Sequence, residues 1–107
     1  VILSLQHGKL YLDNVVFSLA EELNGRGNLP VGRHKVEARY SHKHERVLPH
    51  VESVGWLGFD TPCAIVLGKV RVGGGIIPCS DMVERLLACI RIETEADRPI
   101  LMEITHG

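Results

Sequence analysis

The chain lacks any long apolar run, which limits where it can be placed in a cell. Apolar runs such as residues 64–67 are far shorter than the roughly 20 residues that a membrane-spanning helix requires. No basic segment followed by an apolar segment opens the sequence, so the pattern of a secretory signal peptide is missing. We therefore expect a soluble, cytoplasmic protein that does not enter a membrane.

The chain also lacks an excess of either charge. Twelve Lys and Arg residues stand against thirteen Asp and Glu residues, for a formal net charge of −1. Domains that bind nucleic acid usually carry a basic surface, so the composition argues against a nucleic-acid partner. A length of 107 residues with 45% hydrophobic content is enough for a single domain, residues 1–107, that buries a core without disulfides or a metal.

Cysteine is scarce, and its spacing fits neither a disulfide framework nor a zinc site. The three cysteines, Cys63, Cys79 and Cys89, are odd in number and include no C-x-x-C pair. Free cysteine is commonly buried, so we expect reduced, buried thiols and no cofactor. Cys79 is the candidate for a reactive thiolate, because it stands in an expected loop beside the start of a helix.

Periodicity predicts several strands and one helix near the C-terminal end. A capping pattern at Ser80 or Asp81, with Glu84 behind it, opens a helix that runs to about Ile92. Apolar residues at three- and four-residue spacing give this helix one buried face, formed by Met82, Val83, Leu86, Leu87 and Ile90. Strands are expected at residues 1–5, 9–12, 15–20, 34–40, 46–54, 63–67, 70–72 and 100–104. A tight turn at Asp13 and Asn14 is expected to join the second and third of these into a hairpin, with Val15, Phe17 and Leu19 on one face of the third. The sequence thus predicts an α+β fold, a mostly antiparallel β-sheet or barrel-like sandwich with one C-terminal amphipathic helix followed by a final strand.

Residues 34–40 alternate without a break, which is typical of a strand with one buried and one solvated face. The expected buried face holds His34, Val36, Ala38 and Tyr40, and the solvated face holds Arg33, Lys35, Glu37 and Arg39. The solvated face, with Arg33 and Arg39 as cations, is one candidate binding surface. Trp56 and the glycine triplet 73–75 form a second candidate surface, with core capping as the alternative role of Trp56.

Histidines are concentrated in residues 29–51, which contain four of the six. His42 and His44 would face the same way if the backbone between them were extended, because side chains two apart share a face of a strand. With His50 as a third ligand, they suggest a metal site, although the set has no diagnostic spacing. Solvent-exposed histidines in a polar loop are the alternative.

Three segments together resemble a known family. Residues 17–22 (FSLAEE), 29–36 (LPVGRHKV) and 40–49 (YSHKHERVLP) are similar to motifs of a family of small uncharacterised phage and bacterial domains. That family is distantly similar to the L,D-transpeptidase catalytic domain, a mostly β fold in which a histidine and a nucleophilic cysteine act on peptidoglycan stem peptides. The resemblance places the family histidine near Gly68 and the family cysteine near residues 75–76, so it implies the scaffold without the catalytic pair.

Three hypotheses for the function follow. The first is a non-catalytic accessory or interaction domain, encoded by a phage-like or other mobile element of bacteria, which binds a protein partner or a second copy of itself. The second is a cysteine-dependent enzyme acting on cell-wall peptides, with Cys79 as nucleophile and His42 or His50 as its base. The third is a metal-binding module built from His42, His44 and His50.

Overall fold

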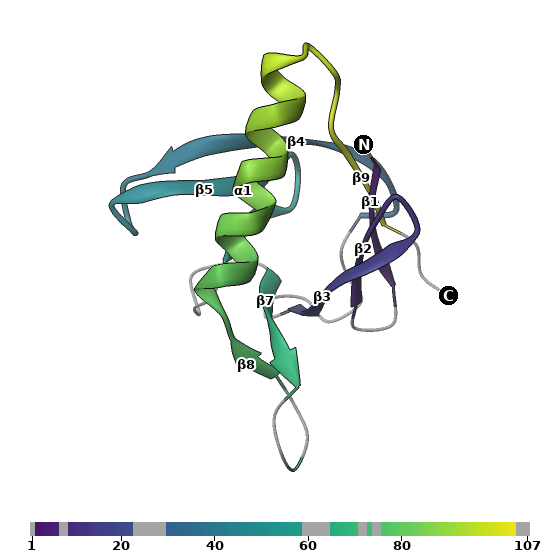
Figure 1. Cartoon of the computed structure of the whole chain (residues 1–107), viewed down its shortest axis with the longest axis vertical. Coiled ribbons are helices and arrows are strands. Elements are labelled where there is room, and N and C mark those ends of the chain that lie inside the picture. The colour runs from purple at the N-terminus through teal and green to yellow at the C-terminus, as the bar shows by residue number, and fades with distance from the viewer. Residues whose placement is uncertain are drawn as a thin grey trace.

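The computed structural model describes residues 2–6, 9–22, 30–58, 65–70, 73 and 76–104, and within these it contains nine strands and one helix (Figure 1). In chain order they are β1 (Ile2–Gln6), β2 (Lys9–Leu12), β3 (Val15–Glu22), β4 (Gly32–Ser41), β5 (Arg46–Val51), β6 (Gly55–Gly58), β7 (Ile65–Val70), β8 (Ile76–Pro78), α1 (Ser80–Glu95) and β9 (Leu101–Ile104). The order confirms the predicted fold class, in which one helix precedes a final strand.

The strands form one mixed sheet in the order β3-β2-β1-β9-β4-β5-β6-β7-β8, with a further pairing between β3 and β7. Most neighbours are antiparallel, whereas β1 pairs with β9 and β6 pairs with β7 in parallel. β4 bends between two parts of this sheet, because residues 32–35 pair with β9 and residues 36–41 pair with β5. In Figure 1 the β4–β5 hairpin accordingly extends away from the group formed by β1, β2, β3 and β9.

α1 packs its apolar face against β4, β5, β6 and β7. All five residues of the predicted apolar stripe are buried, at 8% exposure for Met82 and at most 1% for Val83, Leu86, Leu87 and Ile90. Each such burial contributes about 1.5–3 kcal/mol. Within the described part of the chain, no helix combines the length and apolar character needed to cross a membrane.

The start of α1 differs from the prediction. The N-cap is Cys79, and no side chain caps the first turn, so the expected capping pattern of Asp81 and Glu84 is absent. Glu84 instead forms an ion pair with Arg46, which lies on β5. Tertiary packing of the apolar stripe, rather than a side-chain cap, therefore fixes where the helix begins.

The N-terminal hairpin has the expected turn and an unexpected buried face. Asp13 and Asn14 adopt positive φ angles of 48° and 70°, as the tight turn between β2 and β3 requires. The sequence placed Val15 and Phe17 on the face with Leu19, whose side chain lies outside the described part. In the structure Ser18 and Ala20 are buried and Val15 is 68% exposed. The register shift at residues 10–11 pairs Leu10 with Ser18, so the buried face of β2 continues onto Ser18.

Candidate functional site

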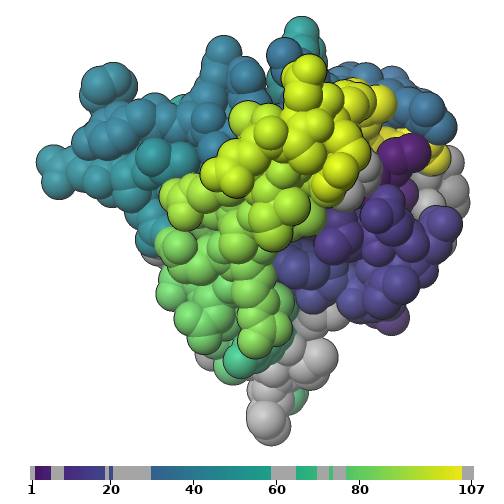
Figure 2. Space-filling view, turned by 45° about the horizontal axis from the view of Figure 1, so that its top comes forward, coloured from purple at the N-terminus to yellow at the C-terminus, as the bar shows by residue number. Residues whose placement is uncertain are grey.

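Two adjoining cavities form a groove between β4 and the C-terminal half of α1. One has a volume of about 370 Å³ and is lined by Lys35, Val36, Glu37, Thr94, Asp97, Arg98, Pro99 and Ile100. The other has a volume of about 340 Å³ and is lined by Glu37, Ala38, Ile90, Arg91, Thr94 and Glu95. Glu37 and Thr94 line both, so the two cavities are neighbours along β4 and α1. In Figure 2 the C-terminal end of α1 and the turn after it, in yellow, lie against the blue surface of β4.

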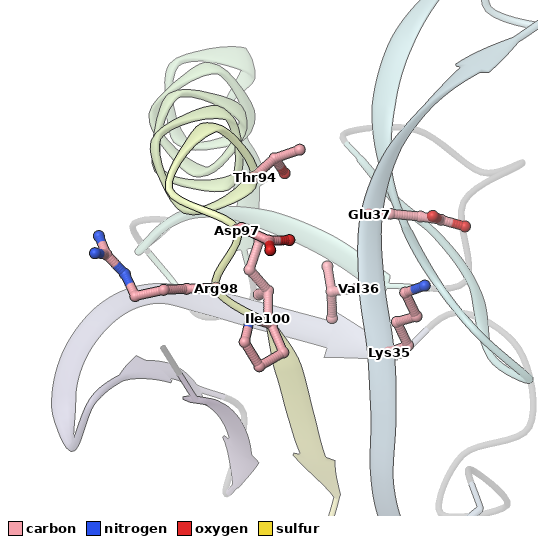
Figure 3. A pocket seen from close by; sticks show the side chains of 8 residues that line it. Lys35, Val36, Glu37, Thr94, Asp97, Arg98 and Ile100 are labelled. Carbon is pink, nitrogen blue, oxygen red and sulfur yellow. The ribbon is translucent and has the colours of Figure 1, made fainter.

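The groove lies over the edge of β4 rather than over one of its faces. Successive side chains of a strand point to opposite faces, yet Lys35, Val36 and Glu37 all line the first cavity. Figure 3 shows Val36 on the side of β4 that faces Ile100 and α1, and Glu37 pointing to the other side. A cavity lined by side chains from both faces of β4 must extend around the edge of the strand.

The groove has an apolar floor and a rim of mixed charge. Val36, Ile90 and Ile100 are at most 5% exposed and belong to the hydrophobic core. Above this floor, charged side chains of both signs stand on β4, on α1 and on the turn that follows, namely Lys35, Glu37, Arg91, Glu95, Asp97 and Arg98. This composition is typical of a protein-binding surface, with an apolar centre and a polar rim.

An ion pair between Arg98 and Glu93 connects the turn after α1 to the helix. The Arg98 guanidinium donates to both carboxylate oxygens of Glu93, at 2.7 and 3.1 Å, and the Arg98 backbone N–H donates to the Glu93 carbonyl at 2.9 Å. The hydrogen bond from Arg98 lowers the pKa of Glu93, against the opposing effect of its burial. Asp97, with φ of 55°, lies in the turn between Glu93 and Arg98, where the chain reverses direction. These contacts connect the turn to the end of α1, and together they form one wall of the groove.

Beyond Val36, the edge of β4 that faces the groove has no strand partner among the described residues. The Val36 N–H donates to the Ile100 carbonyl at 2.9 Å, whereas the Lys35 carbonyl on the opposite side accepts the N–H of Glu52 at 2.9 Å. Backbone groups of an antiparallel strand alternate in direction, so Ala38 and Tyr40 also point their N–H and C=O toward the β9 side. No described strand pairs with either residue there. Tyr40, predicted to be buried, is 52% exposed because the hairpin extends past the core.

Arg33 and Arg39, the predicted binding cations, lie on different parts of β4. Arg33 forms an ion pair with Glu103, its neighbour on β9, at 3.1 Å. Arg39 forms an ion pair with Glu37 at 2.9 Å, on the part of β4 that pairs with β5. Of these two arginines, Arg39 is therefore the one adjacent to the groove, through its contact with a residue that lines it.

The three predicted metal ligands have separate partners. Residues 42–45 form a turn, so the extended backbone that would align His42 with His44 is absent. The His42 ring meets Tyr40 edge-on, and His44 Nδ1 and the Ser41 hydroxyl share a hydrogen bond of 2.8 Å. Among the described residues, no three His, Cys, Asp or Glu side chains are grouped as a metal site would need.

Trp56 lies on β6 and is half-buried against the core. Its ring meets that of His50 edge-on, with 4.8 Å between the ring centroids. Of the glycine triplet, only Gly73 lies inside the described part, with φ of 89°, a backbone conformation that a glycine adopts without strain. The structure therefore brings Trp56 together with His50 and leaves the rest of that candidate surface undescribed.

Cys79 is half-buried between β8 and α1, where its backbone N–H donates to the Leu67 carbonyl at 3.0 Å. Within the described part of the chain, no hydrogen bond joins its thiol to a histidine. Cys89 is also half-buried rather than fully buried, and its burial raises the pKa of its thiol. Cys63 lies outside the described residues.

No protein-family model matches the chain, and no curated protein or solved structure is significantly similar to it. The resemblance to the phage and bacterial domains therefore stays a prediction. The evidence for a function is therefore the geometry of the groove between β4 and α1.

The groove was not predictable from the sequence, because its residues come from two distant segments. The alternation of residues 34–40 predicts solvated side chains at Lys35 and Glu37, but no pattern in the sequence places residues 90–100 beside them. Pro99, just before β9, is not such a signal, because in the register of β4 and β9 its missing N–H would point away from β4.

Proposed function

We propose that the chain is a non-catalytic interaction domain that binds a protein partner in the groove between β4 and α1. The observation that carries this proposal is the pair of neighbouring cavities beside one strand edge, with a buried apolar floor and a rim of mixed charge. The resemblance of residues 29–36 and 40–49 to phage and bacterial domains supports a role in a phage-like or other mobile element.

The cysteine-enzyme and metal hypotheses lack comparable support. A cysteine nucleophile needs a base within hydrogen-bonding distance, and in the described part of the chain no hydrogen bond joins the Cys79 thiol to a histidine. A metal module needs three or four ligands in one place, and His42, His44 and His50 contact different neighbours. Neither arrangement competes with the groove as a binding site.

Selection from a library of short random peptides, followed by titration of the selected peptide, tests the proposal. We expect the peptide to shift the backbone amide NMR signals of residues 35–38 and 90–100. Thr94→Arg should weaken binding at least about tenfold, or about 1.4 kcal/mol, because Thr94 lines both cavities and a long cation there fills the groove.

The matched control is Ala88→Arg, which introduces the same side chain at an exposed position of α1 outside both cavities. Arginine has a high helix propensity, so both variants should fold. Failure to select any peptide would count against the proposal. Selected peptides that bind Thr94→Arg as tightly as the wild type would place the binding site elsewhere and overturn it.

A further inference from the structure

We infer that the partner binds as an added β-strand, an extended polypeptide segment that hydrogen-bonds to the backbone of Ala38 and Tyr40. This inference rests on the proposed function and specifies the chemical form of the partner. Strand addition needs an exposed sheet edge whose N–H and C=O groups point outward, beside pockets that take alternate side chains. Both features are present at the groove.

The open edge exists because β9 leaves β4 early. Lys35 pairs with Leu101, and the hydrogen bond from Val36 to Ile100 continues that register by one residue. If β9 continued, Arg98 would lie opposite Ala38. The Arg98 backbone N–H donates instead to the Glu93 carbonyl, so the chain turns back to α1. The groove therefore occupies the place where the next residues of this strand would lie.

The residues around this edge determine which side chains an added strand should carry. On one face of β4, Ala38 and the buried Ile90 bound the smaller cavity, which suits an apolar side chain. On the opposite face stand Glu37 and Arg39, which suit a polar or charged side chain. The preferred segment alternates apolar and polar residues, because successive side chains of an added strand face these two environments in turn.

A second copy of the chain fits this edge poorly. A two-fold pairing of β4 strands centred on Ala38 would place Tyr40 of the second copy opposite Val36, where Ile100 already lies. A pairing centred on Arg39 would set two arginines opposite each other, and like charges in that position destabilise a strand pair. A pairing centred on Tyr40 would need residue 42, which belongs to a turn. A separate polypeptide has none of these conflicts.

The variant Ala38→Pro tests strand addition. Proline removes the outward N–H, and position 38 donates nothing to β5, so the β4–β5 ladder stays intact. We expect it to weaken binding of the selected peptide at least about tenfold, equal to about 1.4 kcal/mol. Ala38→Ser keeps the amide and nearly the size of the side chain, so it measures the effect of the side chain alone, and Ala38→Pro should weaken binding at least about tenfold more than Ala38→Ser does.

Amide hydrogen exchange gives a second measurement that needs no variant. Bound peptide should slow exchange at the Ala38 and Tyr40 amides, because each would become hydrogen-bonded. Methylation of backbone nitrogens along the peptide should abolish binding only at alternate residues, since alternate residues of the added strand face β4. These readouts remain decisive if Ala38→Pro fails to fold.

The possible failures are distinguishable. If Thr94→Arg blocks binding while Ala38→Pro does not, and neither amide gains protection, strand addition is wrong and the proposed function stands. If Thr94→Arg has no effect, the proposed function itself fails. If sedimentation shows a dimer of the wild type that Ala38→Pro abolishes, the occupant of the edge is a second copy and the separate partner is overturned.

Discussion

His50 lies at the centre of a row of side chains that crosses three strands, between Glu37 on β4 and Trp56 on β6. Burial is the main cause that lowers the pKa of His50 from its ordinary 6.5, and the nearby Arg39 guanidinium lowers it further. The carboxylates of Glu37 and Glu52 act in the opposite direction without cancelling this effect. The folded state therefore holds the neutral imidazole at pH values where the unfolded chain is already protonated.

We predict that acidification destabilises the protein through His50. The unfolded chain binds this proton near pH 6.5 and the folded chain binds it only at lower pH, so stability falls as the pH decreases between these two values. His50→Gln should show a smaller fall in melting temperature over that interval, because glutamine does not titrate. Thermal melts across a pH series measure the difference, and equal slopes for the two proteins would contradict the prediction.

α1 is the element on which packing of the β4–β5 half of the sheet depends. Leu87, in the middle of its apolar stripe, is 1% exposed. We predict that Leu87→Ala lowers the free energy of unfolding by about 2–5 kcal/mol, through lost burial and the cavity that remains. Ile92→Ala, at a position of the same helix that is 61% exposed, should change it by less than about 0.5 kcal/mol. Urea titrations of both variants provide the test, and similar losses would mean that the stripe does not anchor the helix.

The same helix illustrates which elements a sequence specifies. Its apolar stripe has a strong 3.6-residue period, so its face and its approximate start were predictable. Its last turn was not, because Glu93 is buried by its ion pair with Arg98 rather than by apolar character. β6 and β8 were missed for a different reason. They have only four and three residues and include glycine or proline, so their pairing comes from neighbouring strands rather than from local preference.

The candidate site depends still more on the whole fold. The alternation of residues 34–40 predicted which β4 side chains are solvated near the groove, and Lys35 and Glu37 do line it. The open edge arises because β4 pairs with β9 up to Lys35 and with β5 from Val36 onward. It also requires that the Arg98 N–H donates to the Glu93 carbonyl of α1 and not to β4. These are contacts between residues far apart in the chain, and no local pattern encodes them.

The bend in β4 raises the question of whether the two parts of the sheet unfold together. The first part includes β1 and β9, whose parallel pairing joins opposite ends of the chain, and the second includes the β4–β5 hairpin under α1. β3 also pairs with β7, so the parts are connected at a second place besides β4. Core residues from both, such as Leu3, Leu48 and Met102, belong to one buried cluster.

We therefore predict a single cooperative unfolding transition. Trp56, the only tryptophan, reports on β6 by fluorescence, and far-ultraviolet circular dichroism reports on α1. Amide exchange at Met102 reports on β9. Because one core connects these elements, the three probes should give the same denaturant midpoint and the same dependence on denaturant. Separate midpoints for Trp56 and Met102 would show that β4 joins two independently stable units, and the groove at its bend would then lie on a hinge.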